Sequence, residues 1–376
     1  MKQINNWLNG SIYLDPLSPA CKMCAQGSKM VVLVTGLCSS NCYYCPLSFK
    51  KGGKDRIFAN EWELENEKDT KKLIKEAENI NATGAGITGG DPLLVWRRVK
   101  EYITLLKELF GSKFHIHLYT TGIKNANHII DLISAGLDEV RFHPFPEFWG
   151  KLDDSSFKKP IKNVLDSSAD IAIEIPSIPS LESETYSLIK WANDNGLKWI
   201  NLNELEFSER NFKQFEDKGY KQKDELSAAV KGSQKSAISI LKIAQNDDFD
   251  IGLHYCSVSF KDGIQLRNRI KRRAKNVAKK YDVITEEGTI IKGVIYCTNS
   301  SFDKLLKLLK EEYQIPEIYF FYDENNTRIE IGLWILDKIS EELDKKGYKC
   351  YMVEEYPTED RLQIERTPMP INKSTS

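Results

Sequence analysis

The sequence has no long apolar run and no excess of charge of either sign. None of its hydrophobic stretches approaches the roughly 18 consecutive apolar residues of a membrane-spanning helix. The opening residues, MKQINNWLNGSIYLDP, lack the apolar core of a secretory signal. The 53 basic and 54 acidic residues nearly cancel, so no overall field favours nucleic acid or a membrane as partner. We therefore expect a cytoplasmic protein without membrane association.

Histidine is scarce in this chain, whereas cysteine is not. There are 5 histidines and 8 cysteines among 376 residues, and most of the cysteines fall within residues 21–45. A reducing compartment keeps thiols free, so clustered cysteines there indicate metal ligands before disulfides. The sequence thus directs attention to its N-terminal quarter.

Short β-branched runs alternate with segments of helical spacing from residue 30 onward. This alternation predicts parallel β/α units with right-handed crossovers. The number of units suits an α/β fold of the partial (β/α)6 type, an open TIM barrel, in which ligands bind at the C-terminal ends of the strands. The expected strands are residues 30–35, 84–88, 114–120, 138–144, 170–176, 198–204 and 250–255.

The pattern changes near residue 257, where a basic amphipathic segment begins. We predict three parts: an N-terminal extension at 1–29, the barrel at 30–256, and a small α+β C-terminal domain at 257–376. Within the last part we expect a hairpin turning at 286–288, helices near 301–313 and 332–346, and strands at 317–323, 348–355 and 361–366.

Cys38, Cys42 and Cys45 lie in the loop that follows the first expected strand, at spacings of four and three. A structural zinc site has four ligands, and this loop offers three. Three thiolates on a [4Fe–4S] cube would leave one iron without a protein ligand, open to a substrate or cofactor. A zinc site completed by a distant residue, or buried free thiols, are the alternatives.

This Cys-x3-Cys-x2-Cys motif, with Tyr44 before the last cysteine, resembles the signature of the radical S-adenosylmethionine superfamily. The segment TGGDPL at 88–93 resembles that family's Gly-Gly-Glu-Pro motif, with Asp91 in the acidic position. The resemblance spans roughly residues 30–255. It implies a [4Fe–4S] cluster whose open iron chelates S-adenosylmethionine, and an electron donor such as ferredoxin or flavodoxin. One electron would cleave the cofactor to methionine and a 5′-deoxyadenosyl radical, which abstracts hydrogen from substrate.

The resemblance also suggests which residues at the later strand ends meet the cofactor or the substrate. Arg141 and His143 end the fourth expected strand and Asn203 ends the sixth, so these three are candidates for substrate chemistry. Arg141 has an alternative role in a structural ion pair. The expected cofactor-binding residues are Tyr44, Thr88, Gly89, Gly90, Asp91, Thr120, Arg141, Glu174 and Asn201.

A second metal site is our hypothesis for the remaining N-terminal cysteines. Cys21 and Cys24 form a Cys-x2-Cys pair, which supplies half of a metal site. His254 and Cys256 lie at the end of the last barrel strand, which a barrel brings near the first. The site would hold zinc or an iron–sulfur cluster, and Cys297 could replace His254. A mere pair of thiols is the alternative.

The segment at 266–280 carries many lysines and arginines and, from residue 267, no acidic residue. Such a face could follow a phosphate backbone, although a solvated helix face or contact with an acidic protein is also open. The basic helix makes RNA, and tRNA modification in particular, our main expectation for the substrate.

Two other function classes remain. The chain most resembles an archaeal group described as related to pyruvate formate-lyase activating enzymes, which suggests an activase that forms a glycyl radical on a partner protein. Radical modification of a small molecule, or a non-catalytic iron–sulfur module, forms the third class.

Overall fold

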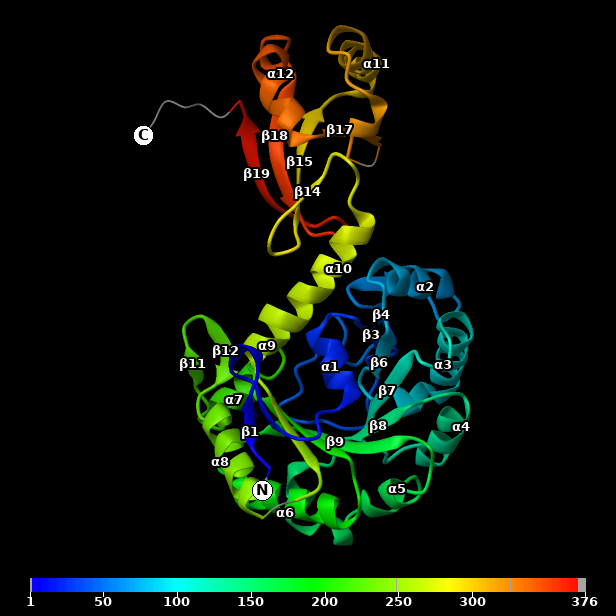
Figure 1. The fold of residues 1–376 in the computed structure, drawn as a ribbon, viewed down its shortest axis with the longest axis vertical. Helices are drawn as coiled ribbons and strands as arrows, with labels where there is room; N and C mark the ends of the chain where they lie inside the picture. The colour runs from blue at the N-terminus through cyan, green and yellow to red at the C-terminus, as the bar shows by residue number, and fades with distance from the viewer. Residues whose placement is uncertain (1, 248, 325, 371–376) are drawn as a thin grey trace. The chain divides into compact units, whose positions relative to one another are not determined.

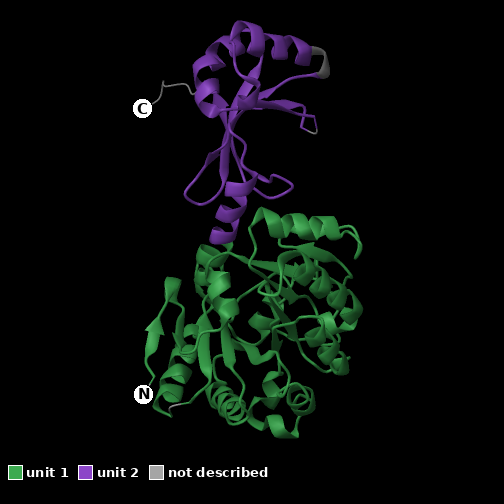
Figure 2. Cartoon of the chain, turned by 45° about the vertical axis from the view of Figure 1, so that its right-hand side comes forward, with its two compact units in different colours: residues 1–266 green, residues 267–376 purple. Residues whose placement is uncertain are grey.

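A computed structural model describes residues 2–247, 249–324 and 326–370 of the chain. The chain forms two compact units, Met1–Leu266 and Arg267–Ser376 (Figure 2). The sequence placed this boundary at 256/257. The short helix α9, Val258–Phe260, belongs instead to the first unit, since Asn9 Nδ2 donates to the Ser259 carbonyl at 3.1 Å and Ser257 Oγ donates to the Asn9 carbonyl at 2.6 Å.

Parallel strands form the centre of the first unit, within a sheet whose described part has 11 strands (Figure 1). Each overlaps one of the runs expected from the sequence, so the open, partial barrel is confirmed. Because successive residues on both faces of these strands are largely buried, the strands read as short apolar runs. They are β3 Lys29–Leu33, β6 Gly84–Thr88, β7 His115–Thr120, β8 Glu139–Phe142, β9 Asp170–Ser177, β10 Trp199–Glu204 and β13 Gly252–Cys256.

Antiparallel strands extend the sheet at both edges. At one edge β2, Ile12–Leu14, pairs with β13, and β1, Ile4–Asn6, pairs with β2. At the other edge β4, Ile57–Ala59, pairs with β3, and β5, Trp62–Leu64, pairs with β4. The order β1-β2-β13-β10-β9-β8-β7-β6-β3-β4-β5 leaves the sheet open. The N-terminal extension therefore supplies an edge of the barrel. Its helix α1, Pro19–Ala25, lies within the curve of the sheet (Figure 1).

The longer helices of the first unit lie around the outside of the sheet (Figure 1). Their apolar faces, such as Val99, Ile103 and Leu106 of α3, are fully buried. No helix in the described ranges is long and apolar enough to cross a membrane. The helices are α2 Thr70–Asn79, α3 Trp96–Phe110, α4 Ile129–Ser134, α5 Lys158–Lys162, α6 Glu182–Asp194, α7 Phe212–Asp217 and α8 Ser233–Asn246, and a hairpin of β11 Gln222–Asp224 and β12 Ser227–Val230 precedes α8.

The second unit is an antiparallel sheet with helices, the small α+β fold that was expected. The sheet has the order β16 Phe320–Asp323, β17 Arg328–Ile331, β15 Ile290–Tyr296, β18 Lys349–Glu355, β19 Gln363–Met369, and β14 Val283–Ile284 pairs with β15. Its helices are α10 Arg267–Val277, α11 Asn299–Lys307 and α12 Leu333–Lys345. Ile295, Ile329 and Leu336 are fully buried in its apolar core.

A buried charge network covers part of the other face of this sheet. Lys292 Nζ lies 2.6 Å from Glu355 Oε1 and 3.1 Å from Glu330 Oε2. Arg328 Nη2 lies 2.6 Å from Glu330 Oε1 and 3.3 Å from Glu355 Oε2. Burial alone would raise the pKa of Glu330, but the Lys292 charge, the Tyr281 hydroxyl and Arg328 outweigh it and lower that pKa to about 2. The Glu330 carboxylate is therefore ionised at neutral pH.

Candidate functional site

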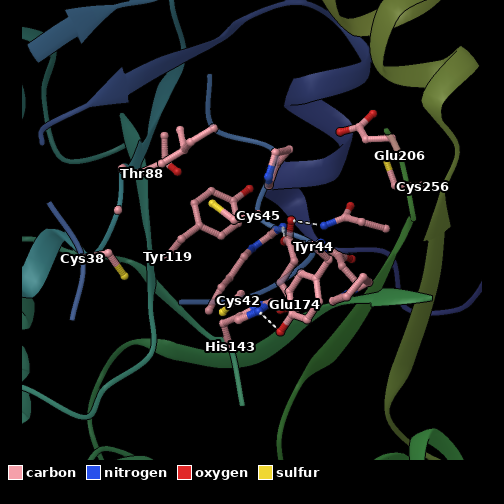
Figure 3. Close-up of a pocket in the computed structure, with 18 of the residues that line it drawn as sticks. Cys38, Cys42, Tyr44, Cys45, Thr88, Tyr119, His143, Glu174, Glu206 and Cys256 are labelled. Atoms are coloured by element: carbon pink, nitrogen blue, oxygen red, sulfur yellow. Dashed lines mark hydrogen bonds and ion pairs between the residues drawn. The ribbon is translucent and has the colours of Figure 1, made fainter. Parts of the chain in front are cut away.

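A cavity of about 490 Å³ opens at the C-terminal ends of the parallel strands (Figure 3). Both cysteine groups singled out from the sequence line it. In the view of Figure 3, Cys38 and Cys256 lie at opposite sides of the cavity, with Tyr44 and Cys45 between them. The expected residues on its wall are Cys21, Cys24, Cys38, Cys42, Tyr44, Cys45, Thr88, Gly89, Gly90, Thr120, Arg141, His143, Glu174, Asn201, Asn203, His254 and Cys256.

The loop that carries Cys38 is fastened to the end of β6 by main-chain hydrogen bonds. Gly90 N donates to the Thr35 carbonyl and Asp91 N donates to the Leu37 carbonyl, both at 2.8 Å. The backbones approach so closely that a Cβ atom on Gly90 would lie 2.0 Å from the Leu37 oxygen, and one on Gly89 would lie 2.2 Å from the Thr35 oxygen. Only glycine fits there, which gives the TGGD segment a physical role in positioning the cysteine loop.

The thiols of this loop suit a polynuclear cluster. Cys38 is exposed, whereas Cys42 and Cys45 are half-buried. Burial raises the pKa of Cys42 to about 11, and the neighbouring Cys45 and Cys38 thiols add to this rise. Throughout the described residues, no three His, Cys, Asp or Glu side chains are placed to hold one metal ion. The loop supplies three thiols, which fits a cube with one open iron, whereas a structural zinc site takes four ligands.

The Asp91 carboxylate faces away from the cavity and is fully buried. It accepts hydrogen bonds from Thr120 Oγ1 at 2.7 Å and Thr121 Oγ1 at 2.5 Å, and from Leu93 N at 3.2 Å. These bonds hold the end of β6 against the end of β7. Its side chain therefore fixes the neighbouring loops, and a cofactor contact at this position would have to come from the main chain.

Tyr44 and His143 form a hydrogen-bonded pair on the cavity wall (Figure 3). His143 Nδ1 lies 2.7 Å from the Glu174 carbonyl, which can only accept, so Nδ1 carries the proton. Nε2 is then the acceptor, and the Tyr44 hydroxyl donates to it at 2.9 Å. Burial lowers the pKa of His143, which keeps the ring neutral. The pair orients Tyr44 beside the cysteines that flank it.

Arg141 forms the structural ion pairs that were its alternative role. Its Nε donates to Glu139 Oε1 at 2.5 Å and its Nη1 donates to Glu174 Oε2 at 2.6 Å. Its Nη2 donates to Ser18 Oγ at 3.1 Å and lies 3.7 Å from Cys21 Sγ. Arg141 thus connects α1 to two barrel strands, and few of its donors remain for a ligand.

Glu174 joins this arginine to two asparagines. Asn201 Nδ2 donates to its Oε2 at 3.0 Å and Asn203 Nδ2 donates to its Oε1 at 2.8 Å. Burial would raise the pKa of Glu174, but the Arg141 charge and the asparagine hydrogen bonds outweigh it and lower that pKa. The carboxylate is therefore ionised, and it fixes both amide groups at the cavity wall.

The second cysteine group lies on α1 and β13. Asn201 Nδ2 lies 3.4 Å from Cys21 Sγ, and Gln265 Nε2 lies 3.6 Å from Cys256 Sγ. Burial raises the pKa of Cys24 to about 11. Cys297 belongs to the second unit, where it packs against the apolar core. A shared metal at Cys21, Cys24, Cys256 and His254 stays a prediction at this stage.

Sequence reasoning missed several polar residues on the cavity wall. Lys261 Nζ lies 2.8 Å from Glu206 Oε1. Burial lowers the pKa of Lys261, but the Glu206 carboxylate outweighs it and raises that pKa, so the lysine is charged. Tyr119 and Gln265 also line the cavity. Lys261 lies shortly after the HYC segment at 254–256. Because the domain boundary was expected at 256/257, this lysine fell outside the expected barrel and was not counted among the candidate residues.

The basic helix uses part of its charge inside the second unit. Arg267 Nε lies 2.9 Å from Glu287 Oε2. Arg273 is buried; its Nη1 donates to the Pro357 carbonyl at 2.5 Å and its Nη2 lies 3.7 Å from Glu359 Oε2. The charge run is thus not simply a solvated surface for a phosphate backbone.

Comparison with known proteins adds the family. Residues 32–144 match the family described as "Radical SAM superfamily", and residues 288–369 match "Domain of unknown function (DUF8061)". The chain is 39% identical over 364 residues to "Putative glycyl-radical enzyme activating enzyme MJ0021" of Methanocaldococcus jannaschii, an archaeon, and the match covers 94% of this chain and 93% of that protein.

Solved structures that match part of this chain include SuiB of Streptococcus suis. SuiB bound to S-adenosylmethionine matches 61% of this chain and 50% of its own, with 10% identity and a TM-score of 0.43. A second SuiB structure matches 69% of this chain and 54% of its own, with 11% identity and a TM-score of 0.45. The chain therefore spans about half the length of SuiB.

The fold and the cysteine loop define an enzyme that uses an iron–sulfur cluster and S-adenosylmethionine. The chain belongs to the radical SAM superfamily, as its motifs indicated, and its relative is archaeal. A [4Fe–4S] cluster and S-adenosylmethionine are the cofactors of this superfamily, and its enzymes need an electron donor.

Proposed function

We propose that this enzyme activates a partner protein by forming a glycyl radical on it. The observation that carries the proposal is the 39% identity to a protein named as a glycyl-radical enzyme activating enzyme, over nearly the full length of both chains. A match of that extent includes the C-terminal unit as well as the barrel. The C-terminal unit therefore does not argue against a role in activating a partner protein, since the match to the relative named as an activating enzyme extends over it.

The proposed reaction assigns roles to residues already described. Cys38, Cys42 and Cys45 would hold the [4Fe–4S] cluster. One electron from a donor such as ferredoxin or flavodoxin and one S-adenosylmethionine would give methionine, 5′-deoxyadenosine and a glycyl radical on the partner. Glu174 and Asn203 supply an ionised acceptor and an oriented amide at the wall, which suit the polar groups of cofactor or peptide.

Glycine suits abstraction at the end of such a cavity. It has no side chain, so the Cα hydrogen of a partner segment can reach a recessed site with little steric hindrance. The partner's main-chain amides would then be the groups that need hydrogen bonds at the wall. The Asn203 amide, held by Glu174, is our candidate for one of them.

RNA was the main expectation from the sequence, and no comparison supports it. The expectation of an RNA substrate rested on the charge of the basic helix alone. In that helix, Arg267 and Arg273 form ion pairs within the second unit. RNA modification therefore becomes an outcome that the test must distinguish.

The test uses the full-length, anaerobically reconstituted enzyme, S-adenosylmethionine and a chemical reductant, added to extract of cells that lack this protein. Formation of a glycyl radical predicts a doublet in the electron paramagnetic resonance spectrum, split by the remaining α-hydrogen. The doublet should collapse to a singlet when the cells are grown on glycine deuterated at Cα. The Cys42→Ala variant is the matched control and should give no signal.

Two results would contradict the proposal. In one, 5′-deoxyadenosine forms in the extract while no doublet appears. In the other, tRNA from cells that lack the protein has lost a modified nucleoside that the added wild-type enzyme restores, which would return RNA as the substrate.

A further inference from the structure

We propose that Cys21, Cys24, Cys256 and His254 bind a second iron–sulfur cluster in the wall of the barrel cavity. The inference is independent of the proposed activation of a partner protein, since it concerns what these residues bind. It starts from three thiols and an imidazole on one cavity wall, contributed by α1 and β13.

Helix α1 presents two of the thiols in a fixed position. Cys21 and Cys24 are three residues apart, so their side chains lie on the same side of the helix. Ser18 caps the helix by accepting from Ala20 N at 3.1 Å, and its hydroxyl donates to Glu139 Oε2 at 3.0 Å. The helix start is thereby attached to the barrel.

Strand β13 presents the other two groups. His254 and Cys256 are two residues apart, so both side chains point to the same face of the strand. Their partners on β10 are Asn201 and Asn203 in register, and these also line the cavity. The Asn201 amide contacts Cys21 Sγ at 3.4 Å, which brings the α1 thiol to the β10–β13 side of the wall.

His254 supplies the observation that points to a ligand. Its ring is only 3% exposed, it lines the cavity, and neither Nδ1 nor Nε2 has a hydrogen-bond partner. The side chains packed on it are the aromatic rings of Trp7 and Phe260. A buried polar group without a partner is costly, and coordination of a metal would give one ring nitrogen its partner.

N–H donors are placed around the sulfurs. Arg141 Nη2 lies 3.7 Å from Cys21 Sγ, and Gln265 Nε2 lies 3.6 Å from Cys256 Sγ. Hydrogen bonds and positive charge at sulfur stabilise the anionic thiolates of iron–sulfur clusters and tune their potentials. The positive charge of Arg141 next to Cys21 Sγ favours a negatively charged cluster at these cysteines over neutral thiols that bind nothing.

Three thiols and one imidazole supply the four protein ligands of a cube. His254 would take the place of a cysteine at one iron, as imidazoles do in Rieske centres. The Arg141 guanidinium, 3.7 Å from Cys21 Sγ, would compensate the negative charge of such a cluster. A single zinc ion on the same ligands is the outcome that the metal analysis must distinguish.

The experiment removes the first site and asks whether metal remains. The triple variant Cys38→Ala/Cys42→Ala/Cys45→Ala is reconstituted anaerobically with iron and sulfide and assayed for both. We expect it to retain about four irons and four sulfides per chain, half the wild-type content, if both clusters are of the [4Fe–4S] type. Adding Cys21→Ala should abolish this iron. Adding Cys350→Ala, a buried cysteine of the second unit, should leave it unchanged.

The outcomes that overturn the proposal are equally definite. A folded triple variant without iron, or one that carries a single zinc ion, excludes the second cluster. If the triple variant does not fold, the wild type and Cys21→Ala alone are compared: about eight against about four irons supports the site, and equal contents refute it. Strong coupling of the reduced cluster to a histidine nitrogen should vanish in His254→Ala, and its absence from the wild type would remove His254 as ligand.

Discussion

The substitution Gly90→Ala tests the contact between the end of β6 and the cysteine loop. The added Cβ would lie 2.0 Å from the Leu37 oxygen, whereas ordinary contact begins at 3.4 Å, so the backbones must separate by about 1.4 Å. Overpacking costs about 1–3 kcal/mol. The two main-chain hydrogen bonds at 2.8 Å would weaken by about 1 kcal/mol each. We expect a total loss of roughly 3–5 kcal/mol in the first unit.

The functional effect should exceed the effect on folding, because Leu37 directly precedes Cys38. A displacement of about 1 Å near reacting groups can lower a rate about a hundredfold. The assay is the formation of 5′-deoxyadenosine from S-adenosylmethionine under reducing conditions, with iron content measured on the same sample. Gly150→Ala is the control, since its Cβ would meet only Glu184 Cγ at 3.8 Å. If Gly90→Ala keeps wild-type iron and a rate within about twofold, this contact does not position the loop.

Three further predictions concern charges. Glu174→Gln removes the carboxylate that faces Arg141 and should lower the free energy of unfolding of the first unit by about 2 kcal/mol in denaturant titrations. Lys292→Met leaves buried Glu355 without its nearest cation and should destabilise the second unit by about 3–5 kcal/mol, whereas an unchanged melting temperature would contradict the network. Because folding lowers the pKa of Glu330 from 4.5 to about 2, its contribution is complete above pH 4.5 and is lost as pH falls toward 2; this difference is worth about 3 kcal/mol. Glu330→Gln should flatten the acid side of the stability curve.

The sequence predicted the barrel well because its parallel strands are buried. Runs such as 170–176 are rich in apolar and β-branched residues, with Glu174 as the one charged residue inside the run, so their strand type could be predicted from the local sequence. The edge strands Ile4–Asn6 and Ile12–Leu14 were missed because three residues give no readable period. Strand Arg328–Ile331 was missed because Arg328 and Glu330 read as solvated, whereas they pair in a buried network.

The candidate site, like the fold, could be predicted only in part. The motifs indicated Cys38, Cys42, Cys45 and the two glycines directly, because few physical roles suit these residues in that order. The partners of Arg141 could not be predicted, since Glu139 and Ser18 reach it only through strand register and the placement of α1. The orientation of the Asp91 carboxylate away from the cavity depends on the hydroxyls of Thr120 and Thr121 at the neighbouring strand end, which no local pattern reveals.

The most direct test of the central claim is reductive cleavage of S-adenosylmethionine by the reconstituted full-length protein. We expect 5′-deoxyadenosine and methionine in equal amounts, formed only with reductant, and none above background from the Cys38→Ala, Cys42→Ala or Cys45→Ala variants. A wild-type protein that is loaded with its cluster and reduced, yet forms no 5′-deoxyadenosine, would contradict the assignment of this site to radical chemistry.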